Sequence, residues 1–284
     1  MTPITGGLLM NEVRAVATRK GDYTRICELV ADDRRFVELE SALLAGSNLP
    51  GPRGNLELAA AFADCVAVEQ LTEPQWALLT AWLALAEDEA PTGDPHEFLP
   101  FCALQALGAC FFDADHVRKT DIVRRLREVA NDGRWRMRDG VAMALQRIGE
   151  RDFDAVTDIL DGWLPDANLL EERAIVAALA HPPMLRYRER VRYCLGVSDR
   201  IMINLAAVDP SGRKAEPFAV LKKGLSYALS VFVAALPEEG FAFLERWARS
   251  DDRDVKAIVR ENLKKNRLTR PFASAVARVV AVLG

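Results

Sequence analysis

Hydrophobic, small and basic positions recur along this chain in one nine-residue pattern. It reads apolar, basic, two free positions, apolar, small, free, small and leucine. Clear copies span Met137–Leu145, Leu221–Leu229 and Val255–Leu263, and a degenerate copy spans Glu172–Ala180. The basic positions are 35, 49 and 34 residues apart and are occupied by Arg138, Arg173, Lys222 and Lys256. Self-similarity at this period predicts stacked helix pairs, the architecture of a helical solenoid.

Short turns rich in proline and glycine divide the rest of the chain into helical patterns. The first helices are predicted over 8–19, 22–31 and 33–46, and the main breaks fall at 46–54, 87–97 and 208–217. The last of these breaks explains the 49-residue step. A weaker copy of the pattern, Leu99–Leu107, has Pro100 at the basic position and lies 38 residues before the Met137 copy.

These elements predict an all-α fold of about six antiparallel helix pairs, stacked in one right-handed curved array. The arrangement resembles the HEAT/armadillo-like α-solenoids, in which each pair has an outer and an inner helix, and the pattern would mark the inner one. We expect a single domain over 1–284, with a helical cap over 1–50, repeats over 51–206 and C-terminal repeats over 207–284.

The basic position of the pattern has a structural and a functional interpretation. In the HEAT-like arrays that this chain resembles, a basic residue here commonly bonds an aspartate of the preceding turn and ties neighbouring repeats together. Asp132 precedes Arg138 and Asp166 precedes Arg173 in the same way. We therefore expect a ladder of such bonds at these positions rather than a ligand site.

The opposite face of the first clear copy carries an aromatic residue. At about 100° per residue, Met137, Val141 and Leu145 cluster on one side of the helix. Trp135 and Asp139 fall on the other side. Tryptophan is costly to leave in water and usually covers something, so an indole beside a carboxylate at i, i+4 indicates a binding site. The alternative is that Trp135 packs under a neighbouring helix and that Asp139 caps a helix or pairs with an arginine.

The same face becomes basic toward the C-terminus. The third copy contributes Lys223, Ser226 and Ser230 to it. The fourth copy opens a stripe at helical spacing that consists of Lys256, Arg260, Lys264 and Arg267. Spaced cations suit a polyanion, because the phosphates of a nucleic acid need several charges at separated positions. The alternative is ordinary solvated helix surface.

Charge is unevenly divided along the chain. Residues 1–116 have a net charge of −11 and residues 117–284 a net charge of +7, with −4 for the whole. An anionic partner would therefore meet the second part, and the acidic first part suits a basic protein. No apolar run matches a membrane span, no leader pattern is present, and the five cysteines form no C-x-x-C pair. We expect mostly buried thiols and a cytoplasmic protein.

Three short segments resemble the DNA alkylation repair family, helical-repeat glycosylases that remove alkylated purines. They are W-R-M-R-D from Trp135, W-L-P-D-A-N-L-L-E-E-R-A-I from Trp163 and D-V-K-A-I-V-R-E-N-L from Asp254. Their order and separation match that family over about half of the chain. The resemblance implies that Asp139 stabilises an oxocarbenium ion or orients water, and that Arg173 is the arginine of the next inner helix.

The resemblance also implies that Trp135 holds a cationic alkylpurine by cation–π contact. Lys223, Arg260 and Lys264 would hold phosphates. The chain departs from the family at its second aromatic position, because Val259 and Arg260 stand there. Its net charge of −4 also contrasts with a family that tends to be basic.

No other chemistry has a sequence signature. The chain has no glycine-rich phosphate loop and its three histidines show no metal spacing, so we expect no metal and no cofactor. Our leading hypothesis is a non-catalytic scaffold whose concave face accepts a protein or nucleic-acid ligand, such as duplex DNA, with no membrane partner. Its ligand-binding residues would be Trp135, Arg173, Lys223, Arg260, Lys264 and Arg267. The alternatives are a DNA glycosylase with Asp139 as catalytic residue, and a protein-only adaptor that uses the acidic N-terminal half.

Overall fold

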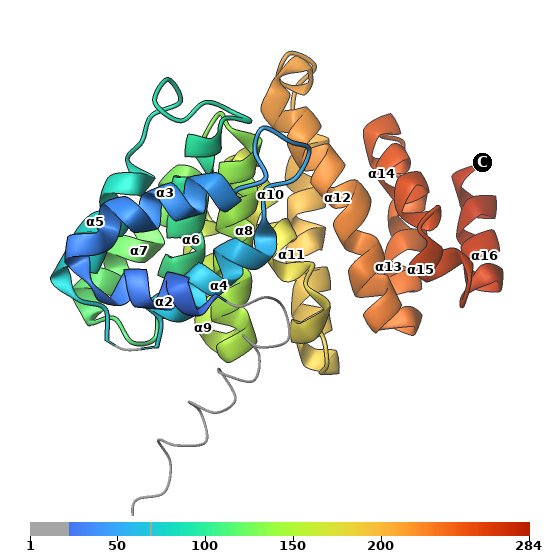
Figure 1. The fold of residues 1–284 in the computed structure, drawn as a ribbon. Helices are drawn as coiled ribbons and strands as arrows, with labels where there is room; N and C mark the ends of the chain where they lie inside the picture. Colours follow the sequence, from blue (N-terminus) through green and yellow to red (C-terminus); the bar gives the residue numbers. More distant parts are fainter. Residues whose placement is uncertain (1–22, 69) are drawn as a thin grey trace, which may run out of the picture. The chain divides into compact units, whose positions relative to one another are not determined.

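The computed structural model describes residues 23–68 and 70–284. Across those residues it has fifteen α-helices, four short 3-10 helices and no strand, which confirms the all-α prediction (Figure 1). The helix expected over 8–19 lies outside the described residues. The next two expected helices are present as α2 (Thr24–Ala31) and α3 (Phe36–Gly46). The chain divides into two compact units, unit 1 over 1–144 and unit 2 over 145–284, with the boundary inside α8 (Trp135–Arg151).

Unit 1 is built around α6 (Phe98–Cys110), a helix that is apolar on all sides and almost entirely buried. Its other helices are α4 (Leu56–Val66), α5 (Glu73–Leu83) and α7 (His116–Val129). α6 contacts α3, α4, α5 and α7, and α4 also contacts α2. Gly108 lets α8 approach α6 closely, because a Cβ at this position would lie 2.6 Å from the Ala144 carbonyl oxygen.

The helices of unit 1 begin at residues that the sequence marks as caps. The Asn55 and Asp115 side chains accept backbone N–H groups in the first turns of α4 and α7. Thr72 and Gln75 form a capping box at the start of α5. Each cap satisfies an N–H group that the helix leaves without an internal partner, so the start of each helix is fixed locally.

The cysteines of the described chain fall into two groups. Cys27 and Cys65 form a disulfide that joins α2 to α4, a pairing that the sequence did not predict. Cys102, Cys110 and Cys194 are buried and lie outside this disulfide, in agreement with the expectation of mostly buried thiols. The expectation of a cytoplasmic protein was based in part on unpaired thiols. Disulfides are rare in the reducing cytosol, so the Cys27–Cys65 bond does not support that expectation, which stays a prediction.

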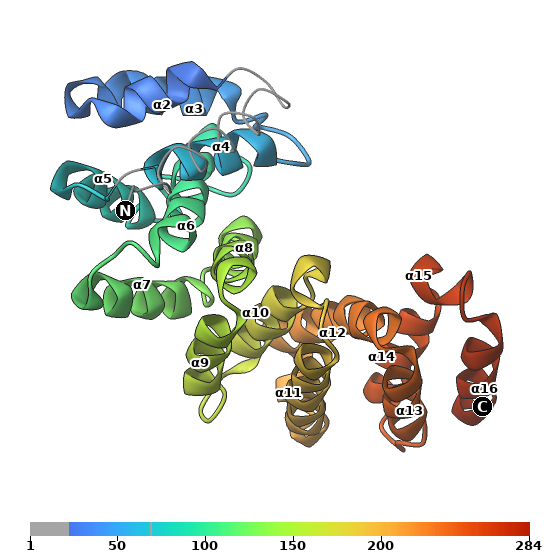
Figure 2. The same cartoon turned by 90° about the horizontal axis from the view of Figure 1, so that it is seen from below.

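Unit 2 contains the end of α8 and eight further helices: α9 (Phe153–Trp163), α10 (Leu169–Leu179), α11 (Arg188–Ala207), α12 (Glu216–Ala235), α13 (Pro237–Ala248), α14 (Arg253–Leu263), α15 (Asn266–Thr269) and α16 (Ala273–Leu283). Figure 2 shows α10, α12 and α14 in one layer and α9, α11 and α13 in the other. α12 lies between α10 and α14 in its layer and also contacts α11 and α13.

The nine-residue pattern marks the layer formed by α10, α12 and α14. In this layer the Lys222 ammonium donates to the Asp254 carboxylate (2.7 Å), and Arg213 donates to the same carboxylate (3.0 Å). The hydrogen bond from Lys222 holds the pKa of Asp254 below its ordinary value. The basic residue of this copy therefore bonds the aspartate that precedes the next copy, whereas the expected ladder paired each basic residue with the aspartate before its own copy.

α12 differs from the sequence expectation in one respect. It is 20 residues long and, by length and composition, apolar enough to cross a membrane, although no apolar run was expected to reach that length. Half of its most apolar stretch is buried inside the protein. Such a helix is also what the centre of a helical unit requires, and its neighbours α10, α11, α13 and α14 surround it.

Candidate functional site

The first part of α8, which belongs to unit 1, has one buried side and one more exposed side. Met137 and Val141 are fully buried, whereas 44% of Trp135 is exposed. Asp139, one turn after Trp135, is half-buried and takes part in further contacts. The guanidinium of Arg136 lies 4.4 Å from the centroid of the Trp135 ring. The sequence left open whether Trp135 is covered; the indole is partly exposed, and one cation already stacks on it.

Arg136 is buried and joins two other segments of unit 1, a role that was not predicted from the sequence. Its Nη1 donates to Glu97 Oε2 (2.9 Å) and its Nη2 donates to the Gly51 carbonyl oxygen (2.8 Å). Glu97 is fully buried. The pair ties two loops of unit 1, those around residues 51 and 97, to the start of α8. Arginine alternates with apolar residues in the segment R-W-R-M-R, and such a pattern usually indicates solvated surface. Only the position of the buried Glu97 carboxylate shows that Arg136 points inward.

The neighbouring arginines also serve the backbone. Arg138 Nη1 donates to the carbonyl oxygen of Asp132 (2.8 Å), not to its carboxylate as the ladder prediction supposed. The carboxylate of Asp132 instead binds Arg134 (2.7 Å), which also donates to the Ala90 carbonyl oxygen (3.1 Å). Hydrogen bonds to these carbonyl groups fix the turn before α8 and with it the position of Trp135.

Arg173 and Lys223 lie on neighbouring helices of unit 2. The Cγ atom of Arg173 is 3.3 Å from the position that a Cβ on Gly224 would take, so its side chain runs along α12. Arg173 is half-buried and Lys223 is exposed. Because Gly224 has no side chain, the side chain of Arg173 has room to lie against α12.

Tyr227 on α12 contacts two cations and was not predicted from the sequence as a site residue. Its side chain is 51% exposed. The guanidinium of Arg267 lies 4.6 Å from the ring centroid, and its Nη2 donates to the Tyr227 hydroxyl (2.8 Å). The ammonium of Lys265 lies 6.0 Å from the same centroid. Tyr227 sits one helical turn after Lys223, and this i, i+4 spacing was the signal that could have found it.

The cations of α14 are exposed. Arg260 lies in the last turn of α14 and Lys264 directly follows the helix, and both are exposed. Lys264 binds Glu261, which holds the pKa of that glutamate below its ordinary value. Arg267 is half-buried because of its contact with Tyr227. We use the name cationic surface for the group in unit 2 that consists of Lys223, Tyr227, Arg260, Lys264 and Arg267.

Ser230 corrects the predicted extent of this face. The sequence placed it beside Lys223, but it is fully buried. Its N–H donates to Asn262 Oδ1 (2.7 Å), and the Asn262 amide donates to the Leu225 carbonyl oxygen (2.9 Å). Asn262 thereby locks α14 against α12. Ser230 is buried because α14 packs against this part of α12, so its exposure depends on a neighbouring helix and not on the face of α12 alone.

The predicted residues thus belong to two separate groups. Trp135 and Asp139 lie in unit 1, and Arg173 and the cationic surface lie in unit 2. Among the described residues, no three histidine, cysteine, aspartate or glutamate side chains gather as metal ligands would. The arrangement offers positive charge and one aromatic ring for an anion in unit 2, and an arginine-stacked indole near a carboxylate in unit 1.

Comparison with known proteins assigns no family to this chain. No family model matches it, and no curated protein matches it. Among solved structures, the chain is similar to the crystal structure of an engineered protein from the Northeast Structural Genomics Consortium, at 16% identity and a TM-score of 0.34. The similarity covers 91% of this chain and 98% of that one. A TM-score this low carries no argument about fold or function.

Proposed function

We propose that this protein is a non-catalytic binding scaffold built as a right-handed, HEAT-like solenoid of about six helix pairs. The support is the sequence period together with the place of its copies on α10, α12 and α14, which are neighbours in one layer. The Lys222–Asp254 bond between successive copies is the kind of tie that such repeats use. In this proposal the layer that carries the copies is the ligand-binding side.

The ligand of the scaffold is a polyanion, and duplex DNA is the form we propose. The observation that carries this is the cationic surface. Among the described residues, neither Lys223 nor Arg260 makes an ion pair, so both charges are available to a partner. Arg267 is held in place by Tyr227 and so loses less side-chain entropy on binding a phosphate.

Salt-dependent DNA binding tests the proposal. Each neutralised phosphate contributes about 0.9 to the slope of log K against log salt, so K223A/R260A should bind more weakly and reduce that slope by roughly 1.8. Fluorescence anisotropy of a labelled duplex, at several salt concentrations, measures both quantities. Arg186→Ala is the control for each single variant, Lys223→Ala and Arg260→Ala, because it also removes one exposed cation but lies outside the cationic surface.

Two results would contradict the proposal. One is the absence of DNA binding by the wild-type protein at low salt. A protein would then be the remaining candidate ligand, including a basic protein that binds the acidic N-terminal half. The other is an equal loss of affinity in the Arg186→Ala control. A protein ligand held by apolar contacts would, in contrast to DNA, bind with little dependence on salt.

A second candidate function is excision of alkylated purines, and the exposure of Trp135 near Asp139 is the observation in its favour. The guanidinium of Arg136 on the indole counts against it, because a cationic base would have to share or displace that stack. The test is release of 7-methylguanine or 3-methyladenine from methylated duplex DNA. Release that collapses in Asp139→Asn supports the activity, and absence of release by the wild type removes it.

A further inference from the structure

Tyr227 is the aromatic member of the cationic surface, and half of its side chain is exposed. The guanidinium of Arg267, on α15, lies over the ring at 4.6 Å from its centroid. That contact covers part of the ring, and the rest faces solvent. A flat apolar surface gains free energy when a partner covers it, so the open part of the ring is a place where a ligand can stack.

Both ends of Tyr227 are held in place. Arg267 Nη2 donates to its hydroxyl (2.8 Å), and Ser230 Oγ donates to its backbone carbonyl oxygen (2.7 Å). Ser230 is itself fixed, because its N–H donates to Asn262 of α14 (2.7 Å). The ring therefore loses little conformational freedom when a ligand stacks on it, which favours affinity.

Cations surround this ring. Lys223 lies one helical turn before Tyr227 on α12, and the ammonium of Lys265 lies 6.0 Å from the ring centroid. Proteins that bind single-stranded nucleic acid combine cations that follow the backbone with aromatic rings that stack the bases. Bases inside a duplex are stacked on one another, so only an unpaired base can reach Tyr227.

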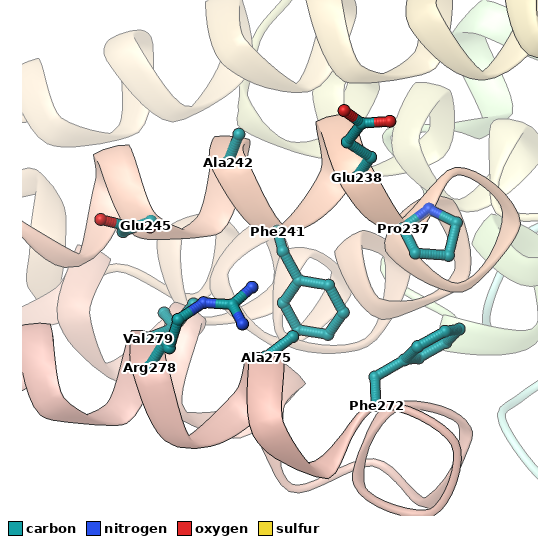
Figure 3. Close-up of a pocket in the computed structure, with 9 residues that line it drawn as sticks. All are labelled: Pro237, Glu238, Phe241, Ala242, Glu245, Phe272, Ala275, Arg278 and Val279. Carbon is teal, nitrogen blue, oxygen red and sulfur yellow. The ribbon is translucent and has the colours of Figure 1, made fainter.

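The aromatic groove between α13 and α16 has a different character (Figure 3). It encloses about 290 Å³, and the rings of Phe241 and Phe272 in its lining lie edge to face, 5.7 Å apart. Two acids, Glu238 and Glu245, line it together with a single base, Arg278. The acids repel phosphate, so this groove does not suit a nucleic-acid strand, whereas the neighbours of Tyr227 attract one.

We propose that Tyr227 stacks an unpaired base, so that the preferred ligand is duplex DNA that continues into a single strand. This inference rests on the proposed function, because the cationic surface must first hold the phosphates. Lys223 and Arg267 bind the backbone of the strand beside the stacked base. Tyr227 is thus the residue that distinguishes DNA with unpaired bases from DNA without them.

Two labelled DNAs with the same phosphates test the role of the ring. One is a duplex with a short single-stranded thymidine extension, and the other is the same duplex with an abasic extension. In fluorescence anisotropy the wild type should bind the thymidine extension about 5- to 150-fold more tightly than the abasic one. Tyr227→Ala should abolish this preference, and Tyr227→Phe, which keeps the ring, should retain it.

Tyr187→Ala is the matched control, because Tyr187 is 56% exposed and has Arg190 at 4.9 Å from its ring centroid, but lies outside the cationic surface. It should leave the preference unchanged, and circular dichroism shows that each variant is folded. The inference is overturned if the wild type binds both DNAs equally, if Tyr227→Ala keeps the preference, or if Tyr227→Phe or Tyr187→Ala also loses it. Absence of binding to either DNA at low salt would overturn the proposed function as well, whereas equal binding of both would overturn this inference alone.

Discussion

Glu172 is a buried carboxyl group at the point where α10 meets α11. Only 1% of it is exposed, its Oε1 accepts a hydrogen bond from Asn204 (2.6 Å), and its Oε2 has no partner. Burial raises its pKa from 4.5 to about 7, against the opposing effects of Asn204 and Arg200. Glu172→Gln keeps the shape and the acceptor and removes the charge. We expect the variant to be more stable than the wild type at pH 8 and equal to it at pH 4.

The sign follows from proton binding. Between pH 4.5 and 7 the folded state holds a proton that the unfolded state has lost, so the contribution of Glu172 to stability is complete below pH 4.5 and is lost as the pH rises through 7. The full loss is at most about 3 kcal/mol. Urea unfolding of both proteins between pH 4 and 8 measures it. A difference that does not change with pH, or an equal change in Glu238→Gln, would refute the assignment.

Single residues show where sequence reasoning succeeds and where it stops. Helix periodicity placed Trp135 on the side away from Met137 and Val141, which are buried, but left open whether a neighbouring helix covers the indole. The roles of Arg136 and Tyr227 depend on Glu97 and Arg267, which lie 39 and 40 residues away. Periodicity reports the face of a helix and not the partner that covers it, so these contacts needed the structure.

Close packing of two elements gives the second prediction. A Cβ on Gly108 would lie 2.6 Å from the carbonyl oxygen of Ala144, a backbone atom that cannot turn aside. Gly108→Ala should therefore push α6 from α8 and lower the free energy of unfolding by about 1–3 kcal/mol. Gly162→Ala is the matched control, because Gly162 lies in α9 with open space around it. That change should raise stability by about 0.5–1 kcal/mol through helix propensity.

Chemical denaturation of both glycine variants decides this prediction. If both gain stability, the contact between α6 and α8 is looser than the structure indicates. If both lose stability, the effect belongs to alanine in these helices in general and not to the contact.

Elements were the level at which the sequence was most informative. Caps such as Asn55 and Thr72 and the proline-rich breaks are local signals, and the helices begin where they indicate. The copies of the pattern also mark helices that are neighbours in unit 2. The partners of the basic positions were not predicted, because Lys222 binds the aspartate before the next copy and Arg138 binds a backbone carbonyl of the turn before its own helix. At Asp132 the carboxylate binds Arg134, and Arg138 donates to the backbone carbonyl oxygen instead.

At the scale of the whole molecule, the cationic surface and the disulfide lie in different units of the chain. The cationic surface and the groove between α13 and α16 belong to unit 2, and the disulfide belongs to unit 1. The charge asymmetry could be read from the sequence, since it is a sum over residues. The disulfide and the groove could not, because each depends on which helices meet in space.

The disulfide gives the last prediction, because it closes a loop in unit 1 alone. Cys27 and Cys65 are 38 residues apart, and closing a loop of that length stabilises a folded chain by up to about 4 kcal/mol. Reduction should therefore speed hydrogen exchange in peptides from α2 to α6 and leave those from α10 to α14 unchanged, as mass spectrometry can resolve. The C27S/C65S variant should show the faster exchange without reductant and no further response to it. An equal change in both units would mean that they unfold as one, and no change in either would mean that α2 and α4 stay together without the bond.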